Sequence, residues 1–331
     1  MGIYWRIYAS RLHAINDYTI ATCGLTLNAI LVWLVINRSA KEMKIYSKIL
    51  LQTCIIDFAL LTFIMAVQPI YLVHDGWNLL VSNGPFRAIT HPWNYMLMAT
   101  WFFIVYFSIV SNCVPFIYRY LVICKLKVIS AFQYFLMLVG CAYVIVLYIC
   151  MLTWSTYPRE AQRNRNYTEV IEILGMNIHN SSQFQIGLMM KTQSIPWAIT
   201  CAFIITMEVI SYSIIAVCGI KIRKFVQCTS RMSQQTDRQL EVHRQISFVL
   251  IMQTLMPILE MSTSLFCMIL SITLDTKANV YAAMFAIMPF HWVPLFNPVV
   301  TIWVIKPYRK FFSFSAIHHT SSETSVLGYK D

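Results

Sequence analysis

The chain has 331 residues, of which 58% are hydrophobic and only 12% are charged. Soluble domains carry about 25% charged residues, and a water-soluble fold of this length could not hide so much apolar surface. The net charge of +11 would suit nucleic acid, but the basic residues lie in segments between apolar stretches and not on one basic face. We therefore expect membrane lipid, and no nucleic acid, around this protein.

Seven stretches are long and apolar enough to cross a bilayer, which takes about 20 residues of helix. They are Tyr18–Asn37, Ile49–His74, Ala88–Tyr118, Val128–Pro158, Thr192–Ile220, Gln245–Leu274 and Ala278–Ile305. Four of them contain no Asp, Glu, Lys or Arg, and the other three contain one acid each. Their polarity does not alternate as it does in the strands of a membrane barrel. The sequence therefore predicts an all-α membrane protein, a bundle of seven transmembrane helices.

The basic residues predict the orientation of this bundle. With the N-terminus outside, 17 Lys and Arg residues fall in the inner segments and 8 in the outer ones. Because cytosolic segments are enriched in Lys and Arg, the N-terminus is expected outside and the C-terminus in the cytosol. Three parts follow: an extracellular segment 1–16, a transmembrane domain 17–305 and a cytosolic tail 306–331 that begins with a short interfacial helix.

The outer loops differ in length and content. The first, Asp75–Arg87, contains Gly and Pro and is expected to form a turn. The longest, residues 155–193, contains the acceptor patterns of N-glycosylation at Asn166 and Asn180. We expect glycan at both asparagines if this loop faces outward.

Ten cysteines are present, but none lies in an outer loop. Eight fall within the predicted spans, where they are expected to act as small apolar packing residues. Cys124 and Cys228 fall in inner loops, a reducing environment, and either could carry palmitate.

Asp57 lies nine residues into the second span from its inner end. An acid in lipid is costly unless it is paired, hydrated or protonated, and such residues are functional by default. We expect Asp57 to face Asn28 of span one and Asn297 of span seven as a buried polar switch. The alternative is a protonated acid that only satisfies a neighbouring backbone group or serine.

Glu208 and Glu260 lie near the middle of spans five and six and should face the bundle interior or a cavity. Glu260 follows Pro257 by three residues, so both share a helix face, and Pro257 should kink span six. Two interpretations stay open: a hinge with a ligand contact, or a protonated Glu that bonds across helices for packing.

Span seven is the most irregular, with Pro289, Pro294 and Pro298 close together. Prolines free backbone carbonyls, which must find donors inside the protein, and Asn297 is the expected partner of one. His291 is expected to be the only membrane-embedded histidine. A lone histidine there is more often a hydrogen-bonded packing residue than a metal ligand.

Span three carries a dense set of aromatic residues in its outer half, including Tyr95, Trp101 and Phe102. An aromatic belt with ordinary packing explains most of them, and a minority could line an apolar ligand pocket. Arg119 lies at the inner end of this span, where it can either reach the interface or act as a switch at the cytosolic mouth.

Motifs of enzymes are absent from the sequence. There are no histidine boxes or paired zinc-binding histidines, no glycine-rich phosphate loop and no nucleophile elbow. We therefore expect no enzymatic activity, no cofactor and no metal.

The chain resembles G-protein-coupled receptors, and within them the nematode serpentine chemoreceptors of the Str and Srd (delta) type. The resemblance runs from span one to the tail. It is carried by Gly24-Leu25-Thr26-Leu27-Asn28, Ile55-Ile56-Asp57, Tyr118-Arg119-Tyr120, Gln253 with Pro257, Asn297-Pro298 and Lys306-Pro307-Tyr308-Arg309. The segment Met43-Lys44-Ile45-Tyr46-Ser47-Lys48 points to the delta class.

This resemblance implies a switch made of Asn28, Asp57, Pro257, Asn297 and Pro298, and a G-protein-coupling surface made of Arg119, Lys221, Arg223 and Arg244. It places the receptor in the plasma membrane, in a sensory-neuron cilium. Three family features are missing: Tyr118 replaces the acid before Arg119, Thr301 replaces the tyrosine after Asn-Pro, and the long outer loop has no cysteine for a disulfide to span three.

The sequence therefore predicts a chemosensory receptor that detects a small molecule or peptide and activates a heterotrimeric G protein. The ligand is expected among the outer halves of spans three, five, six and seven, near Tyr95, Trp101, Phe102, Glu208, Glu260 and His291. The alternative is a transporter or channel that uses the intramembrane acids, although only three acids and no internal repeat are present.

Overall fold

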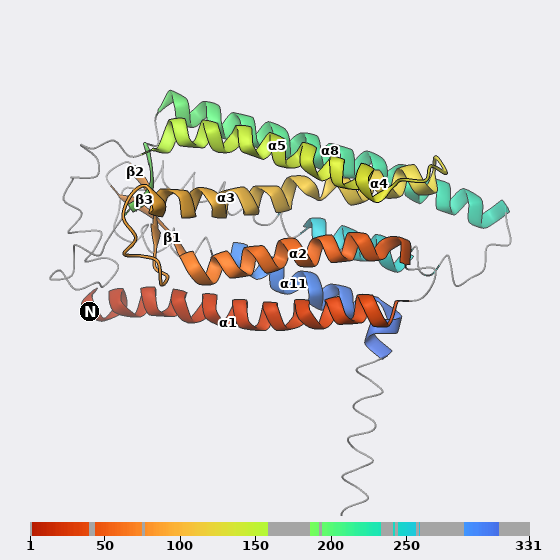
Figure 1. The fold of residues 1–331 in the computed structure, drawn as a ribbon, viewed down its shortest axis with the longest axis horizontal. Coiled ribbons are helices and arrows are strands. Elements are labelled where there is room, and N and C mark those ends of the chain that lie inside the picture. Colours follow the sequence, from red (N-terminus) through yellow and green to blue (C-terminus); the bar gives the residue numbers. More distant parts are fainter. Residues whose placement is uncertain are drawn as a thin grey trace, which may run out of the picture.

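In a computed structural model, the chain forms a bundle of long helices that run along one common axis, with a small β-sheet at one end (Figure 1). The structure describes residues 2–39, 44–74, 77–157, 186–191, 194–232, 241, 244–255, 258 and 288–310. Five helices in this part are long and apolar enough to cross a membrane. They cover Ser10–Asn37, Tyr46–Val67, Trp93–Ile123, Ala131–Thr156 and Ile195–Cys228, and so correspond to the first five predicted spans.

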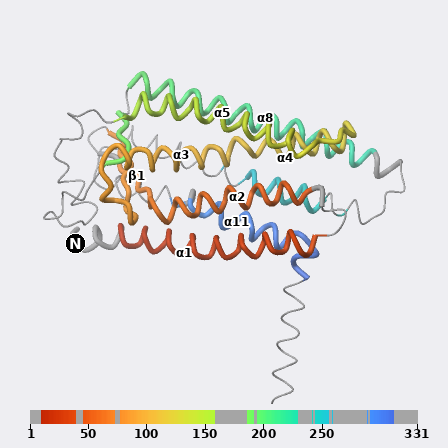
Figure 2. Tube along the Cα trace, viewed as in Figure 1, coloured from red at the N-terminus to blue at the C-terminus, as the bar shows by residue number. Residues whose placement is uncertain are grey.

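Three helices form one side of the bundle: α1 (Gly2–Asn37), α2 (Lys44–Val67) and α11 (Met288–Val304). Figure 2 shows α11, close to the end of the described chain, lying beside α1 and α2 at its beginning. Gly24 permits the close approach of α1 and α2, since a Cβ there would meet the side chain of Leu61 at 2.8 Å. Helix α1 begins well before the predicted first span, so residues 2–16 of the predicted extracellular segment lie on the same continuous helix.

The third predicted span is divided into α3 (Trp93–Ser111) and α4 (Cys113–Ile123) by a turn at Asn112. Pro115 explains this division, because it has no N–H to donate to the carbonyl one turn earlier. The Asn112 N–H donates to the carbonyl of Ile109, three residues earlier, and not four residues earlier as in a regular α-helix. The backbone therefore makes a tighter turn at this point.

The other side of the bundle is formed by α5 (Ala131–Thr156) and α8 (Ile195–Met232). Helix α5 begins with a capping box, in which Ser130 and Gln133 each accept a hydrogen bond from the other's backbone N–H. Helix α8 continues twelve residues past the predicted end of span five at Ile220.

The expectation of an all-α protein was wrong at one end of the bundle. There β1 (Pro69–His74), β2 (Trp77–Ser82) and β3 (Ile186–Lys191) form an antiparallel sheet in the order β1-β2-β3. Strand β1 occupies the last six residues of the predicted second span, and β2 occupies the first outer loop, for which only a turn was expected. Strand β3 lies in the long loop 155–193.

Pro69 explains why α2 ends before the predicted boundary. Proline lacks an N–H and disfavours helical backbone at the preceding residue, and Gln68 indeed has a φ of +44°. The carbonyl of Val67 accepts hydrogen bonds from the Gly84 N–H and the Ser82 hydroxyl. Gly84 is required at this contact, because a Cβ would stand 2.3 Å from the carbonyl oxygen of Ala66.

The sheet closes one end of the bundle by packing on α2 and α3. Leu80 of β2 and Leu188 of β3 share a hydrophobic cluster with residues of both helices, among them Val67 and Met98. We call this end the sheet end, and the opposite end, where α4 carries Arg119, the Arg119 end. The N-terminal part of α1 lies at the sheet end (Figure 1).

Candidate functional site

The described part of the bundle buries three groups of polar and charged side chains at different positions along its length. Arg119 and Ser247 mark one end, Asp57 and Asn297 lie further along, and Asp17 with two histidines lies toward the sheet end. Each group joins residues from different helices. Because buried polar groups are costly unless they are paired, these groups are where a function is most expected.

Arg119 is the largest fully buried side chain in the described part of the protein, with 1% of its surface exposed. Its Nη2 donates a hydrogen bond of 2.9 Å to the hydroxyl of Ser247, on the helical segment 244–255. The guanidinium carbon also stands 5.4 Å from the ring centroid of Tyr46 of α2, a cation–π distance. Arg119 therefore links α4 to α2 and to the segment 244–255, and Tyr118 precedes it in the place of an acid.

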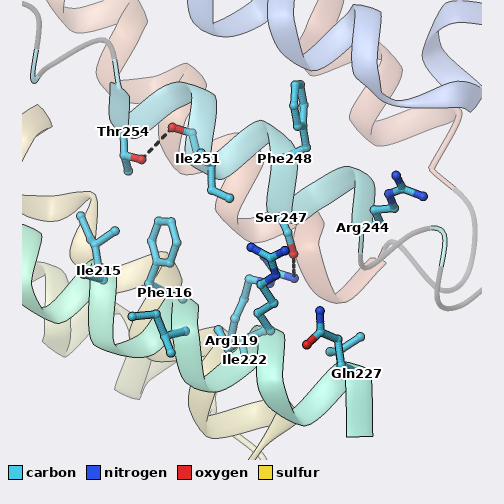
Figure 3. A pocket seen from close by; sticks show the side chains of 15 residues that line it. Phe116, Arg119, Ile215, Ile222, Gln227, Arg244, Ser247, Phe248, Ile251 and Thr254 are labelled. Carbon is cyan, nitrogen blue, oxygen red and sulfur yellow. Dashed lines mark hydrogen bonds between the residues drawn. The ribbon is translucent and has the colours of Figure 1, made fainter. Parts of the chain in front are cut away.

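A cavity of about 850 Å³ opens beside Arg119, between α4, α8 and the segment 244–255 (Figure 3). Its wall is mostly apolar, and its polar groups include Arg119, Arg223 and Arg244. Lys221, the fourth residue predicted for coupling, has its ammonium 5.4 Å from the ring centroid of Tyr120. The lining consists of Phe116, Arg119, Ile215, Ala216, Gly219, Ile220, Ile222, Arg223, Val226, Gln227, Arg244, Ser247, Phe248, Ile251 and Thr254.

The expected contact between Asp57 and Asn297 is present. The Asn297 amide nitrogen lies 3.0 and 3.1 Å from the two carboxyl oxygens of Asp57, and both side chains are buried. Thr301 donates to the backbone carbonyl of Asn297 and accepts a hydrogen bond from Gln253. This chain of bonds connects α2, α11 and the segment 244–255 in the interior of the bundle.

Asn28 plays a different part from the one expected, because its amide does not reach Asp57. It donates to the carbonyl of Pro294 at 3.0 Å and to that of Gly24 at 2.9 Å. Pro298 has no N–H for the carbonyl of Pro294, so this carbonyl needs a donor from another helix. The donor is therefore Asn28 and not Asn297, which was expected to serve a freed carbonyl.

His291 is not alone, contrary to the prediction that it is the only membrane-embedded histidine. Its Nδ1 lies 2.7 Å from Oδ1 of Asp17, and the Nδ1 of His13 lies 3.1 Å from Oδ2 of the same carboxylate. All three side chains have at most 1% of their surface exposed. Helix α1 extends far enough to bury His13 and Asp17, which the sequence placed outside the first span or at its edge.

The other residues predicted for ligand binding do not converge on one point. Trp101 stands with its ring centroid 6.4 Å from that of His291, and Phe102 contacts Trp101. Tyr95 points instead toward α5, where its hydroxyl pairs with that of Thr156 at 3.2 Å. Glu208 of α8 is buried, and its Oε1 has no hydrogen-bond partner among the described residues.

Four predicted residues lie outside the described part of the chain. They are Pro257, Glu260, Asn166 and Asn180. The hinge in span six and the two glycans therefore stay predictions. Of the residues that sequence reasoning missed, His13 and Asp17 carried a signal, because a spacing of four places them on one face of a helix.

Comparison with known proteins agrees with this arrangement. The family model that describes the serpentine type 7TM GPCR chemoreceptor Str matches residues 13–313. Serpentine receptor class delta-32 of Caenorhabditis elegans is 21% identical over 317 residues, which cover 94% of this chain and 87% of that protein. Long apolar helices, buried polar groups between them and a match over most of the length lead to one conclusion: the chain belongs to the Str family of serpentine seven-transmembrane chemoreceptors, a family of integral membrane proteins.

Proposed function

We propose that this protein is a chemosensory G-protein-coupled receptor that detects a small molecule or peptide. It activates a heterotrimeric G protein through the cavity at the Arg119 end. The observation that carries this proposal is the placement of a buried arginine in the wall of an 850 Å³ cavity, where its guanidinium donates to the Ser247 hydroxyl and lies near the ring of Tyr46. Such an arginine can exchange these partners for groups of a protein that enters the cavity.

The orientation follows the distribution of basic residues, with seven spans, the N-terminus outside and the Arg119 end in the cytosol. Arg223 and Arg244 then add positive charge to a cavity that faces the cytosol. The ligand enters at the sheet end, among Trp101, Phe102 and His291. The plasma membrane of a sensory cilium is the location that the family suggests.

A signal has to travel from the sheet end toward the Arg119 end, and α11 contacts both Asp17 of α1 and Asp57 of α2 along this path. It carries His291 toward the sheet end, and Asn297 and Thr301, which contact α2 and the segment 244–255, further along; the prolines at 294 and 298 flank Asn297. A ligand with higher affinity for one packing of α11 shifts the population of the two packings. The prolines lower the cost of such a change because their helix already lacks backbone hydrogen bonds.

The proposal is tested by substituting Arg119. In lipid nanodiscs, wild-type receptor mixed with a heterotrimeric G protein should accelerate the binding of a GTP analogue when a panel of volatile compounds and peptides is added. Arg119→Ala should reduce this acceleration at least tenfold, since the residue that faces the G protein is lost, which corresponds to about 1.4 kcal/mol or more of coupling.

A matched control is Lys224→Ala, the exposed residue next to Arg223 on α8, which is not part of the cavity lining. It should retain the response of the wild type. Coupling that persists in Arg119→Ala at the same amount of folded receptor would remove the cavity from the mechanism. Ion or solute flux in proteoliposomes that is lost in Asp57→Asn would favour a transporter instead.

A further inference from the structure

The group formed by His13, Asp17 and His291 has the composition of a metal site. His13 and Asp17 are four residues apart on one face of α1, and His291 approaches them from α11. One ligand atom from each residue can be chosen so that all three lie within 4.8 Å of one another. The two imidazole rings meet edge to face with centroids 5.6 Å apart, and each contacts a different oxygen of the carboxylate.

Hydrogen bonds within the described residues do not satisfy this group. His291 Nδ1 and the Asn16 amide both bond to Oδ1 of Asp17. Among the described residues, both ring nitrogens of His13, Oδ2 of Asp17 and Nε2 of His291 are buried without a hydrogen-bond partner. His13 Nδ1 stands 3.1 Å from Oδ2 of Asp17 but lacks the direction of a hydrogen bond. Native structures rarely leave so many polar atoms unpaired in one place, and a bound ion is one way of satisfying them.

The donor set selects the kind of ion. Two imidazole nitrogens and one carboxylate oxygen suit Zn²⁺ and neighbouring divalent transition metals, whereas Mg²⁺ and Ca²⁺ prefer oxygen ligands. The charges agree as well, because metal ligands bind as neutral imidazole and ionised carboxylate, so this set of three brings one negative charge to a cation. Three protein ligands leave one coordination position for a fourth ligand.

We propose that His13, Asp17 and His291 bind a divalent transition metal of the zinc class, which ties the sheet end of α11 to α1. The consequence for signalling rests on the proposed receptor function: the metal holds α11 in one packing, in reach of Trp101. A ligand that occupies the open coordination position, such as a thiol, an amine or a carboxylate, then acts directly on α11.

The binding experiment uses full-length receptor in detergent, purified with a tag that contains no histidine and stripped of metal with a chelator. Dialysis against Zn²⁺ followed by elemental analysis should give one zinc per receptor. Co²⁺ in place of zinc should give absorption bands in the visible range that are typical of nitrogen and oxygen ligands. Strong sulfur-to-metal charge transfer would instead assign the metal to cysteines and overturn the proposal, as would a wild-type receptor without stoichiometric zinc.

Substitution assigns the site. His13→Ala and His291→Ala should each bind zinc at least tenfold more weakly than the wild type. His91→Ala is the control, because His91 lies at the same end but pairs through Nε2 with the hydroxyl of Tyr157. Zinc affinity that is unchanged in both variants would contradict the site. Elution profile and melting temperature without metal show whether each variant is folded, and the cobalt bands of the wild type do not depend on the variants.

Hydrogen exchange tests the link between the two helices. Zinc should slow amide exchange in peptides from α1 and from residues 292–304 of α11, and the slowing should disappear in His291→Ala. Zinc that binds without protecting α11 would overturn the proposed tie between the helices. None of these three experiments uses a G protein, so a failure of the Arg119 experiment and a failure of the metal site can be told apart.

Discussion

The two ends of the bundle bury charge in different ways. At the sheet end, the Asp17 carboxylate lies between two histidines from two helices, and a β-sheet covers the neighbouring helix ends. At the Arg119 end, a buried guanidinium meets a hydroxyl and a ring, with an 850 Å³ cavity beside it. The Asp17 carboxylate is enclosed by side chains of the bundle, whereas the Arg119 guanidinium lines a cavity.

This difference indicates where the molecule can move. Elements that rearrange during signalling are drawn from the less stable parts of a structure, with few contacts across the region that opens. A cavity lies between α4, α8 and the segment 244–255, whereas α1 and α11 are joined by buried polar contacts. The sheet end should therefore contribute more to stability, and the Arg119 end more to the conformational change.

The largest effect on stability is expected from Asp17→Ala. Removing the carboxylate leaves two buried histidines without their shared partner, which should lower the free energy of unfolding by about 3 kcal/mol. Denaturant unfolding in detergent, with a chelator present, measures this. Thr19→Ala, at an exposed position of the same helix, should stay within about 0.5 kcal/mol of the wild type. If Asp17→Ala lowered the free energy of unfolding no more than Thr19→Ala, the sheet end would not contribute more to stability than the Arg119 end.

A smaller effect is expected at the other end, from Ser247→Ala. Arg119 loses one acceptor but keeps the ring of Tyr46, so the free energy of unfolding should fall by about 1 kcal/mol. The released guanidinium should also raise nucleotide exchange by the G protein without added ligand. Ser247→Thr keeps the hydroxyl and should behave as the wild type. A stability loss equal to that of Asp17→Ala, with no change in exchange, would reverse the proposed roles of the ends.

The smallest effect is expected from Glu241→Gln, at the exposed ion pair of Glu241 with Lys306. The two charged groups are 2.9 Å apart, and Lys306 lowers the pKa of the Glu241 carboxyl. Exposed pairs contribute at most about 1 kcal/mol. Because the folded pKa is lowered, the contribution is present above the ordinary pKa of glutamate and is lost as the pH falls through the lowered value. Melting temperatures of both forms should therefore differ slightly at neutral pH, and converge in acid and in high salt.

The helices were the predictable part of this fold, because an apolar run of more than twenty residues has few alternatives in a membrane. The contact of Asp57 with Asn297 could also be predicted, since both are costly in lipid and have few other partners. The division at Asn112 was missed, although Pro115 was its signal.

The sheet was missed for a physical reason. The segment 69–74 contains no Asp, Glu, Lys or Arg and continues the apolar run of the helix before it, so a reading from charge to charge could not separate the two. The available signals were local: Pro69 at the boundary, and Asp75-Gly76 between two apolar runs, a dipeptide that favours hairpins. Strand β3 had no such signal, because its partner lies more than a hundred residues earlier in the chain.

The histidine group escaped prediction because it depends on contacts between distant helices. His13 stood in a segment that looked too polar for a membrane, and its burial depends on α11 packing against α1. The spacing of four residues could place His13 beside Asp17, but no sequence pattern indicated that His291 would contact them. Pairing across 274 positions is a property of the folded bundle.

The pairing of β2 with β3 has a consequence for how such receptors can diversify. Every cysteine in the described residues is a free thiol, and the long loop is attached at β3 by main-chain hydrogen bonds. Main-chain groups are the same in every amino acid except proline, so substitutions along the strand preserve the attachment. An attachment of this kind does not depend on a disulfide, so it is kept under reducing conditions while the side chains along the strand can change.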